Sequence, residues 1–184
     1  MTQKNIGNRK ALGSQKKISR ALIDLMAEMP YSEITISKLT EHAGLSRRTF
    51  YRNYTSKEHI INEYYHLIWE EYTGALKKEK DMSLRNVALV FFNTMQKHQD
   101  LLILFNQNNL LNLFLNQVSH LMIEDYSKRS AYAHQMDSKN LTYITLFVSG
   151  AFFQMAKAWF DSGQKESPEE LAGYLEDLNQ IYTD

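Results

Sequence analysis

TISKLTEHAGLSRRTFYRNYTSKE, residues 35–58, is the stretch that decides the fold. Thr35 is a good N-cap for a short helix over 36–43, and Gly44 stands where a left-handed residue would end that helix. A second short helix is predicted over 47–53. Each helix is about two turns long, too short to persist in isolation, so both must pack on longer neighbours. Two short helices joined by a tight glycine turn predict a helix-turn-helix, whose second helix enters the major groove of DNA.

The second short helix carries side chains that suit DNA. From Ser46, its expected N-cap, to Lys57 the chain holds four cations and no acidic residue. Phe50 and Tyr54, four residues apart, can face the core while their neighbours stay outward. Arginine suits guanine edges, and threonine and tyrosine suit phosphates or the thymine methyl group. The candidate DNA-binding residues are Thr35, Ser46, Arg47, Arg48, Thr49, Tyr51, Arg52, Tyr54 and Lys57. The alternative is a solvated basic helix face.

Charge is divided unevenly along the chain, although the formal net charge is zero. Residues 1–57 contain 11 lysines and arginines against 4 acidic residues, a net charge of +7. Residues 58–184 contain 10 against 17, a net charge of −7. A basic third beside an acidic remainder indicates one face for a polyanion and another for a different task. Chance segregation, or a basic tail that aids solubility, is the alternative.

Apolar residues recur at spacings of three and four, and no segment alternates as a half-buried strand would, so we expect an all-α fold. The expected organisation is a flexible basic arm over 1–13 and a three-helix helix-turn-helix domain over 14–57, continuing into a helix over 57–80. A helical ligand-binding and dimerisation bundle over 81–184 follows. About nine helices are predicted, at 15–29, 36–43, 47–53, 57–80, 83–98, 99–107, 109–135, 138–162 and 167–183.

Two capping boxes mark helix starts in the sequence. Thr55 with Glu58 is expected to open the helix that runs to about residue 80, and Ser167 with Glu170 the last helix. Gly163 is the expected stop of the helix before the last.

The stretch from 18 to 61 resembles the DNA-binding region of the TetR family of regulators. AGLS at 43–46, TFYRNY at 49–54 and SKE at 56–58 carry the resemblance, together with the apolar stripe of the first helix. The resemblance implies that this protein is an all-α homodimer and that each subunit binds DNA through this region. The residues that it assigns to phosphates are Thr35, Thr49, Tyr51 and Lys57, and those that it places near bases are Arg47 and Arg48. Many members have a small residue where Arg48 stands.

The stretch SGAFFQMAKAWFDSGQKESPEELAGYL, residues 149–175, is similar to the ends of many TetR-like sequences, in which the last two helices pair with a partner subunit. The helix over 138–162 is apolar nearly all round, so it needs two burial surfaces. A homodimer supplies the second one, and a central helix buried in a monomer is the alternative. The candidate dimer-interface residues are Ser149, Gly150, Phe152, Phe153, Trp159, Leu171, Leu175 and Leu178.

Aromatic residues and methionines are frequent in the C-terminal half. The family resemblance implies an inducer pocket there, and aromatic lining suits an apolar or planar ligand. The candidate pocket residues are Phe91, Met95, Phe114, Met122 and Phe147. Ordinary core packing is the alternative for most of them.

Several classes of protein are excluded by what the sequence lacks. There is no cysteine, and the six histidines show neither HExxH nor a pair four residues apart, so we expect no metal site and no cofactor. No glycine-rich phosphate loop or nucleophile elbow is present, so we do not expect an enzyme. No signal peptide or membrane span is predicted, and the expected location is the cytoplasm.

These observations lead to one main hypothesis and two alternatives. The main one is a homodimeric repressor on an inverted-repeat operator in double-stranded DNA, released by a small-molecule inducer. The second keeps DNA binding but replaces the inducer with a partner protein, in an adaptor-type regulator that could activate. The third is a helical interaction module without DNA binding, against which the four cations and Tyr51 argue.

Overall fold

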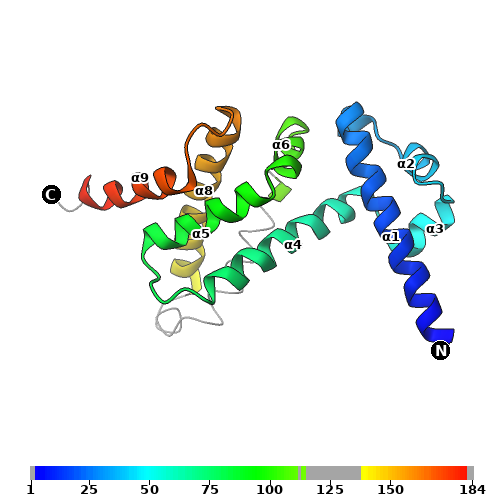
Figure 1. Cartoon of the computed structure of the whole chain (residues 1–184), viewed down its shortest axis with the longest axis horizontal. Coiled ribbons are helices and arrows are strands. Elements are labelled where there is room, and N and C mark those ends of the chain that lie inside the picture. The colour runs from blue at the N-terminus through cyan, green and yellow to red at the C-terminus, as the bar shows by residue number, and fades with distance from the viewer. Residues whose placement is uncertain (1–2, 112, 115–137, 182–184) are drawn as a thin grey trace. The chain divides into compact units, whose positions relative to one another are not determined.

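The computed structural model describes residues 3–111, 113–114 and 138–181, and within them the fold is all-α (Figure 1). No strand occurs in these segments, which confirms the expected fold class. The elements are α1 (Gln3–Glu28), η1 (Tyr31–Glu33), α2 (Ile36–His42), α3 (Arg47–Asn53), α4 (Lys57–Leu76), α5 (Leu84–Lys97), α6 (Gln99–Gln107), α8 (Ser138–Asp161) and α9 (Pro168–Ile181). Most of the helix expected over 109–135 lies outside the described residues.

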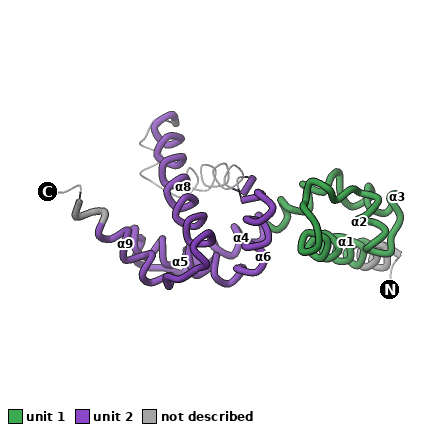
Figure 2. The backbone as a smooth tube through the Cα atoms, turned by 90° about the horizontal axis from the view of Figure 1, so that it is seen from above, with its two compact units in different colours: residues 1–64 green, residues 65–184 purple. Residues whose placement is uncertain are grey.

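The chain divides into two compact units, residues 1–64 and 65–184 (Figure 2). The division falls inside α4, which contributes its first turns to unit 1 and the rest to unit 2. The expected domain boundaries at 57 and 80 stay predictions. None of the helices in the described part of the chain is both long and apolar enough to cross a membrane.

The flexible arm expected over residues 1–13 stays a prediction, although the structure describes a helix in most of this segment. From Gln3 onward this segment is the start of α1, which continues without interruption to Glu28. Gly13 had indicated a break, but it lies inside the helix and has no neighbouring atom within 4 Å of where a Cβ would stand. A glycine inside a helix costs about 1 kcal/mol relative to alanine, which weakens a helix without ending it.

Unit 1 is built on the apolar stripe of α1. Ile18, Leu22 and Leu25 are buried in it, as the spacing predicted. Pro30 follows the helix, and η1 then leads the chain into α2. The two short helices pack on α1 and on each other, which gives them the support that their length requires.

Unit 2 has an aromatic core. The ring centroids of Phe91 and Phe152 lie 5.1 Å apart, and those of Phe92 and Trp159 lie 5.8 Å apart. The aromatic side chains of α5 therefore pack against those of α8. On α4, Tyr65 donates a hydrogen bond of 2.5 Å to the backbone oxygen of Leu110. Because such rings bury much apolar surface and pack edge to face, they give unit 2 a dense centre.

Several helix ends follow the sequence signals, and both ends of α4 depart from them. Ser167 and Glu170 form the expected capping box, since the Ser167 amide donates to Glu170 Oε2 (2.7 Å) and the Glu170 amide to Ser167 Oγ (3.2 Å). Gly163 has a φ of 81°, as a helix stop requires. At α4, however, the His59 amide donates to Ser56 Oγ, so the helix begins one residue later than a cap at Thr55 would set it. The helix also ends at Leu76 and not near 80.

Candidate nucleic-acid interface

The helix-turn-helix forms from local hydrogen bonds that its sequence dictates. Thr35 Oγ1 accepts from the Lys38 amide (3.2 Å) and starts α2, and Ser46 Oγ accepts from the Thr49 amide (3.1 Å) and starts α3. Gly44 between them has a φ of 63°. Only glycine adopts this left-handed conformation without strain, so it sets the sharp turn between the two helices.

Helix α3 has one inward and one outward face. Phe50 is fully buried against the unit 1 core, and its ring lies 5.3 Å from that of Tyr51. Tyr51 is 54% exposed, and Arg47, Arg48 and Arg52 are exposed as well. Three cations and a phenol therefore project from a helix that is anchored at Phe50. The side chain of Thr49 is half-buried, and its hydroxyl lies 3.0 Å from that of Ser46, which is exposed.

Tyr54 does not belong to this outward face, which corrects its place among the candidate DNA-binding residues. Its side chain is 2% exposed, and its hydroxyl lies 2.9 Å from Ser19 Oγ of α1 and donates to Glu63 Oε2 of α4 at 2.9 Å. Burial disfavours the phenolate and raises the pKa of Tyr54 to about 12. Tyr54 is thus a core residue that joins the end of α3 to both longer helices of unit 1.

Lys57 also has partners inside the protein. Its ammonium donates to the backbone oxygens of Tyr31 (2.6 Å) and Ile34 (3.0 Å), and it lies 4.0 Å from the centre of the Tyr31 ring. Burial lowers the pKa of Lys57, and the nearby Glu58 carboxylate opposes that shift. An ammonium has three donors, so one remains after both carbonyls are satisfied. Lys57 therefore fastens the turn before α2 to the start of α4.

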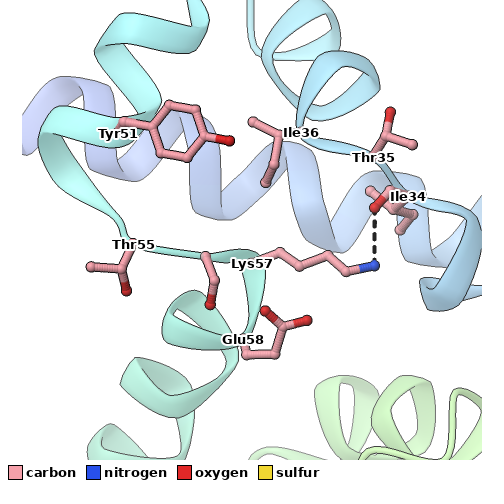
Figure 3. Close-up of a pocket in the computed structure, with 8 residues that line it drawn as sticks. Ile34, Thr35, Ile36, Tyr51, Thr55, Lys57 and Glu58 are labelled. Carbon is pink, nitrogen blue, oxygen red and sulfur yellow. Dashed lines mark hydrogen bonds between the residues drawn. The ribbon is translucent and has the colours of Figure 1, made fainter.

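A surface hollow of about 310 Å³ lies beside these residues. Figure 3 shows Thr35, Tyr51 and Lys57 around it, contributed by the start of α2, by α3 and by α4. The full lining is Ile34, Thr35, Ile36, Tyr51, Thr55, Ser56, Lys57 and Glu58. Glu58 brings a negative charge to the rim, and its carboxylate accepts a hydrogen bond of 2.9 Å from the Tyr31 hydroxyl. Hydroxyl groups and one partly engaged ammonium thus surround an open space next to the outward face of α3.

Comparison with known proteins agrees with this geometry. The family model for bacterial regulatory proteins of the tetR family matches residues 18–64, and a model for a transcriptional regulator C-terminal region matches residues 83–180, just over half of the chain. The chain belongs to the TetR family. Membership makes it a DNA-binding transcriptional regulator, in a family whose members dimerise. The comparison with curated proteins returns no match.

Three solved structures share the fold of this TetR-family chain. A TetR transcriptional regulator from Streptococcus agalactiae has a TM-score of 0.62 at 21% identity, over 94% of this chain and 96% of the other. The fatty acid degradation regulator FadR from Bacillus halodurans has a TM-score of 0.58 at 17% identity, over 89% and 93%. The dihydroxyacetone kinase operon activator DhaS has a TM-score of 0.53 at 22% identity, over 90% and 93%. At these identities the likeness shows the fold alone.

In unit 2 the candidate pocket residues of the TetR-family chain separate into two groups. Phe91, Met95 and Phe114 are buried, where the ring of Phe91 lies against Tyr72 and Phe92. Phe147, in contrast, is 76% exposed, so in this structure it lines no interior space. Met122 lies outside the described residues.

The candidate dimer-interface residues are mostly buried within the subunit in this structure. Their buried members are Ser149, Phe152, Phe153, Trp159, Leu171 and Leu175, each at most 8% exposed. Gly150 is half-buried, and the side chain of Leu178 is not described. The large apolar side chains that α8 exposes are Tyr143, Ile144, Leu146 and Phe147. The helix does have two apolar faces, as expected, but residues 152, 153 and 159 lie on the inner one.

Sequence reasoning missed three residues that bind Tyr54 and Lys57 on either side of the helix-turn-helix. Ser19 and Glu63 meet the Tyr54 hydroxyl, and Tyr31 meets Lys57. Their sequence separations of 35, 9 and 26 residues leave no periodic signal. The only signal in the sequence was Tyr54 itself, because the hydroxyl of a buried tyrosine needs a hydrogen-bond partner.

Proposed function

We propose that this TetR-family regulator is a homodimeric repressor that reads an inverted-repeat operator with α3 of each subunit. The observation that carries the proposal is the outward face of α3, where Arg47, Arg48, Tyr51 and Arg52 project from a helix anchored at Phe50. Two such helices fit successive major grooves about 34–36 Å apart. A dimer on promoter DNA represses by covering it.

Within this proposal, base reading and backbone positioning fall to different residues. Arg47 and Arg48, in the first turn of α3, are assigned to base edges, where arginine can bind guanine through two hydrogen bonds. Thr35, Tyr51 and Lys57 are assigned to phosphate oxygens near the hollow. Thr35 Oγ1 already accepts a backbone hydrogen bond, which leaves its own hydroxyl proton to donate. The remaining donor of Lys57 supports the same assignment.

Fluorescence anisotropy on duplex DNA at rising salt tests the proposal. Affinity should fall steeply, with a log–log slope of about −0.9 per phosphate neutralised. Tyr51→Ala should weaken all duplexes alike, whereas Arg47→Ala should cost about 1–3 kcal/mol and relax preference at one base position. Lys165→Ala, a cation removed from the exposed turn before α9, is the matched control and should change nothing. Flat salt dependence of the wild type would contradict DNA binding by this face.

We assign the dimer contact to the exposed face of α8. Tyr143, Phe147 and Ala151, spaced by four, lie exposed along one side of this helix, and Gly150 beside them presents no side chain to a neighbour. Small residues let another helix approach closely, while the aromatic rings supply buried apolar area. The proposal therefore places the second burial surface of α8 on residues 143–151 and not on the interior phenylalanines.

The effector is assigned to unit 2 as a small apolar molecule that lowers the affinity for the operator. Phe91, Met95 and Phe114 are the described residues that supply an apolar, polarisable environment there. The two tryptophans of the chain, Trp69 and Trp159, both lie in unit 2, and Trp159 lies against Phe92, so binding should change intrinsic fluorescence. To release DNA, the effector must discriminate between the two states by several kcal/mol.

A second candidate is an activator controlled by a partner protein. The observation that favours it is the exposed apolar side of α8, which would suit a protein partner as well as a second copy. One structure of the same fold is described as an operon activator. The oligomeric state of the purified protein separates the candidates: a stable dimer occupies this face, whereas a monomer leaves it for another protein.

A further inference from the structure

Residues 3–17 of α1 include cations and no acidic residue. The first acidic residue of the chain is Asp24, and the five cations before residue 18 are Lys4, Arg9, Lys10, Lys16 and Lys17. Lys16 and Lys17 are exposed. This segment supplies five of the eleven cations in residues 1–57, yet it lies outside the helix-turn-helix.

This charge is held on a helix and not on a loose tail. The helix begins at Gln3 and continues without interruption to Glu28; Figure 1 colours its first turns dark blue. The register is set by the buried residue Ile18 and by the hydrogen bond of 2.9 Å between Ser19 Oγ and the Tyr54 hydroxyl. That bond sets the Ser19 hydroxyl against the hydroxyl of Tyr54, the residue at the end of α3. Residues three apart on a helix have Cβ atoms about 5–6 Å apart, so Lys16 lies one turn before this contact on the same side of α1.

Lys16 and Lys17 differ from Arg20, the next cation along α1, in that only Arg20 has a carboxylate partner among the described residues. Arg20 donates to Asp24 Oδ1 at 2.9 Å, one turn further on. Lys16 and Lys17 form no ion pair with any carboxylate in the part of the chain that the structure describes. A pair of adjacent cations without an internal counter-charge, next to a DNA-reading helix, is complementary to a phosphate backbone.

We propose that α1 supplies a second DNA contact, in which Lys16 and Lys17 bind backbone phosphates outside the base pairs read by α3. This inference rests on the proposed function. The contact adds affinity and salt dependence without adding sequence preference, because phosphate contacts position a protein and base contacts specify its site. Because α1 is one continuous helix that packs on α3, it holds Lys16 and Lys17 at a fixed position relative to α3.

The first test compares two double variants, Lys16→Gln with Lys17→Gln and Lys77→Gln with Lys78→Gln. Both remove two adjacent exposed lysines, the second pair from the turn that follows α4. Anisotropy on duplex DNA should show that the first pair lowers the magnitude of the log–log salt slope by about 1–2, since each phosphate contact contributes about 0.9. Preference among duplex sequences should not change. The control pair should leave the slope at the wild-type value.

The outcomes separate this inference from the proposed function. If the wild type shows no salt-dependent binding, or if Tyr51→Ala has no effect, the proposed function fails. If the wild type binds and Tyr51→Ala weakens it, but the Lys16 and Lys17 pair leaves the slope unchanged, this inference alone is overturned. A change in sequence preference with that pair would also contradict it.

The second test asks which part of α1 makes the contact. Gly13→Pro keeps every cation but removes one backbone donor and clashes with the preceding turn, so it breaks the helix ahead of Lys16 and Lys17. Gly13→Ala fits without contact and favours the helix. The two variants should bind duplex DNA with equal affinity, with thermal unfolding confirming that both fold. A several-fold loss with proline alone would place the contact ahead of residue 13 and overturn the assignment to Lys16 and Lys17.

Discussion

The imidazole of His98, at the junction of α5 and α6, lies 2.8 Å from the carboxylate of Glu71 on α4. Lys97 donates to the other oxygen of the same carboxylate. The hydrogen bond from Lys97, followed by that involving His98, holds the pKa of Glu71 below its ordinary value. Within unit 2, this carboxylate therefore connects α4 to the α5–α6 junction through two basic side chains.

Glu71→Gln should lower the free energy of unfolding at neutral pH by about 1 kcal/mol or less, because the pair is partly exposed to solvent. A carboxyl whose pKa is depressed by folding stabilises the folded state above its unfolded pKa, about 4.3, and this stabilisation is lost as pH falls through the lower folded pKa. The difference between variant and wild type should therefore shrink as the pH falls below the unfolded pKa and vanish below the folded pKa. Urea denaturation from pH 7 to pH 3 measures it.

Glu70→Gln is the control for that experiment, since Glu70 is the exposed neighbour on the same helix. Its curve should parallel the wild type throughout. A Glu71→Gln deficit that persists unchanged at pH 3 would mean that the carboxylate does not provide the stabilisation.

Tyr54→Phe should destabilise unit 1 while leaving the ring packing intact. The change removes the hydroxyl that donates to Glu63 and contacts Ser19, and a hydrogen bond to a charged group contributes about 1.5–3 kcal/mol. The midpoint of urea unfolding, followed by circular dichroism, is the measurement. Tyr174→Phe, at an exposed position of α9, should leave the midpoint unchanged. Equal midpoints for Tyr54→Phe and wild type would refute the role of this hydroxyl.

Glycine-to-alanine changes at two positions should have opposite signs. At Gly44, with φ of 63°, alanine should cost about 1 kcal/mol through left-handed strain. At Gly74, inside α4, alanine should stabilise by about 0.5–1 kcal/mol. Neither Cβ would have an atom within 4 Å, so packing does not contribute to either effect. Thermal unfolding of both variants tests this, and a shift of the same sign at both positions would exclude a backbone origin.

Phe147→Ser should weaken the dimer. Burying a phenylalanine side chain at a contact contributes about 1.5–3 kcal/mol, so the dimer dissociation constant should rise at least tenfold by sedimentation equilibrium. The control is Leu67→Ser, which removes another large exposed apolar side chain from α4. If both variants dimerise as the wild type does, the contact lies elsewhere than on residues 143–151.

Much of the local structure could be predicted because it is encoded over a few residues. The N-caps at Thr35 and Ser46, the left-handed Gly44, and the capping box of Ser167 and Glu170 all depend on neighbours within three residues. The bounds of α3 agree with the predicted range for the same reason. The outward face of that helix followed from the burial of Phe50, which helical spacing alone indicates.

Other features could not be predicted because they depend on residues that meet only in the folded chain. Periodicity shows that α8 has two apolar faces, but only packing decides that Phe152 lies inward and Phe147 outward. The same limit applies to Tyr54, whose inward orientation the helical spacing indicated but whose partners on α1 and α4 it did not. It applies also to Lys57, whose ammonium is bound by backbone carbonyls 23 and 26 residues away.

The amino-acid sequence by itself determined that this chain is all-α, that it carries a cationic helix-turn-helix, and where most of its short helices begin and end, since caps and turns act through contacts between close neighbours. Tertiary structure alone decided which aromatic, tyrosine and lysine side chains are enclosed and which remain for DNA or a second subunit. The physical reason is that a helix periodicity defines faces, whereas burial depends on which distant element covers each face.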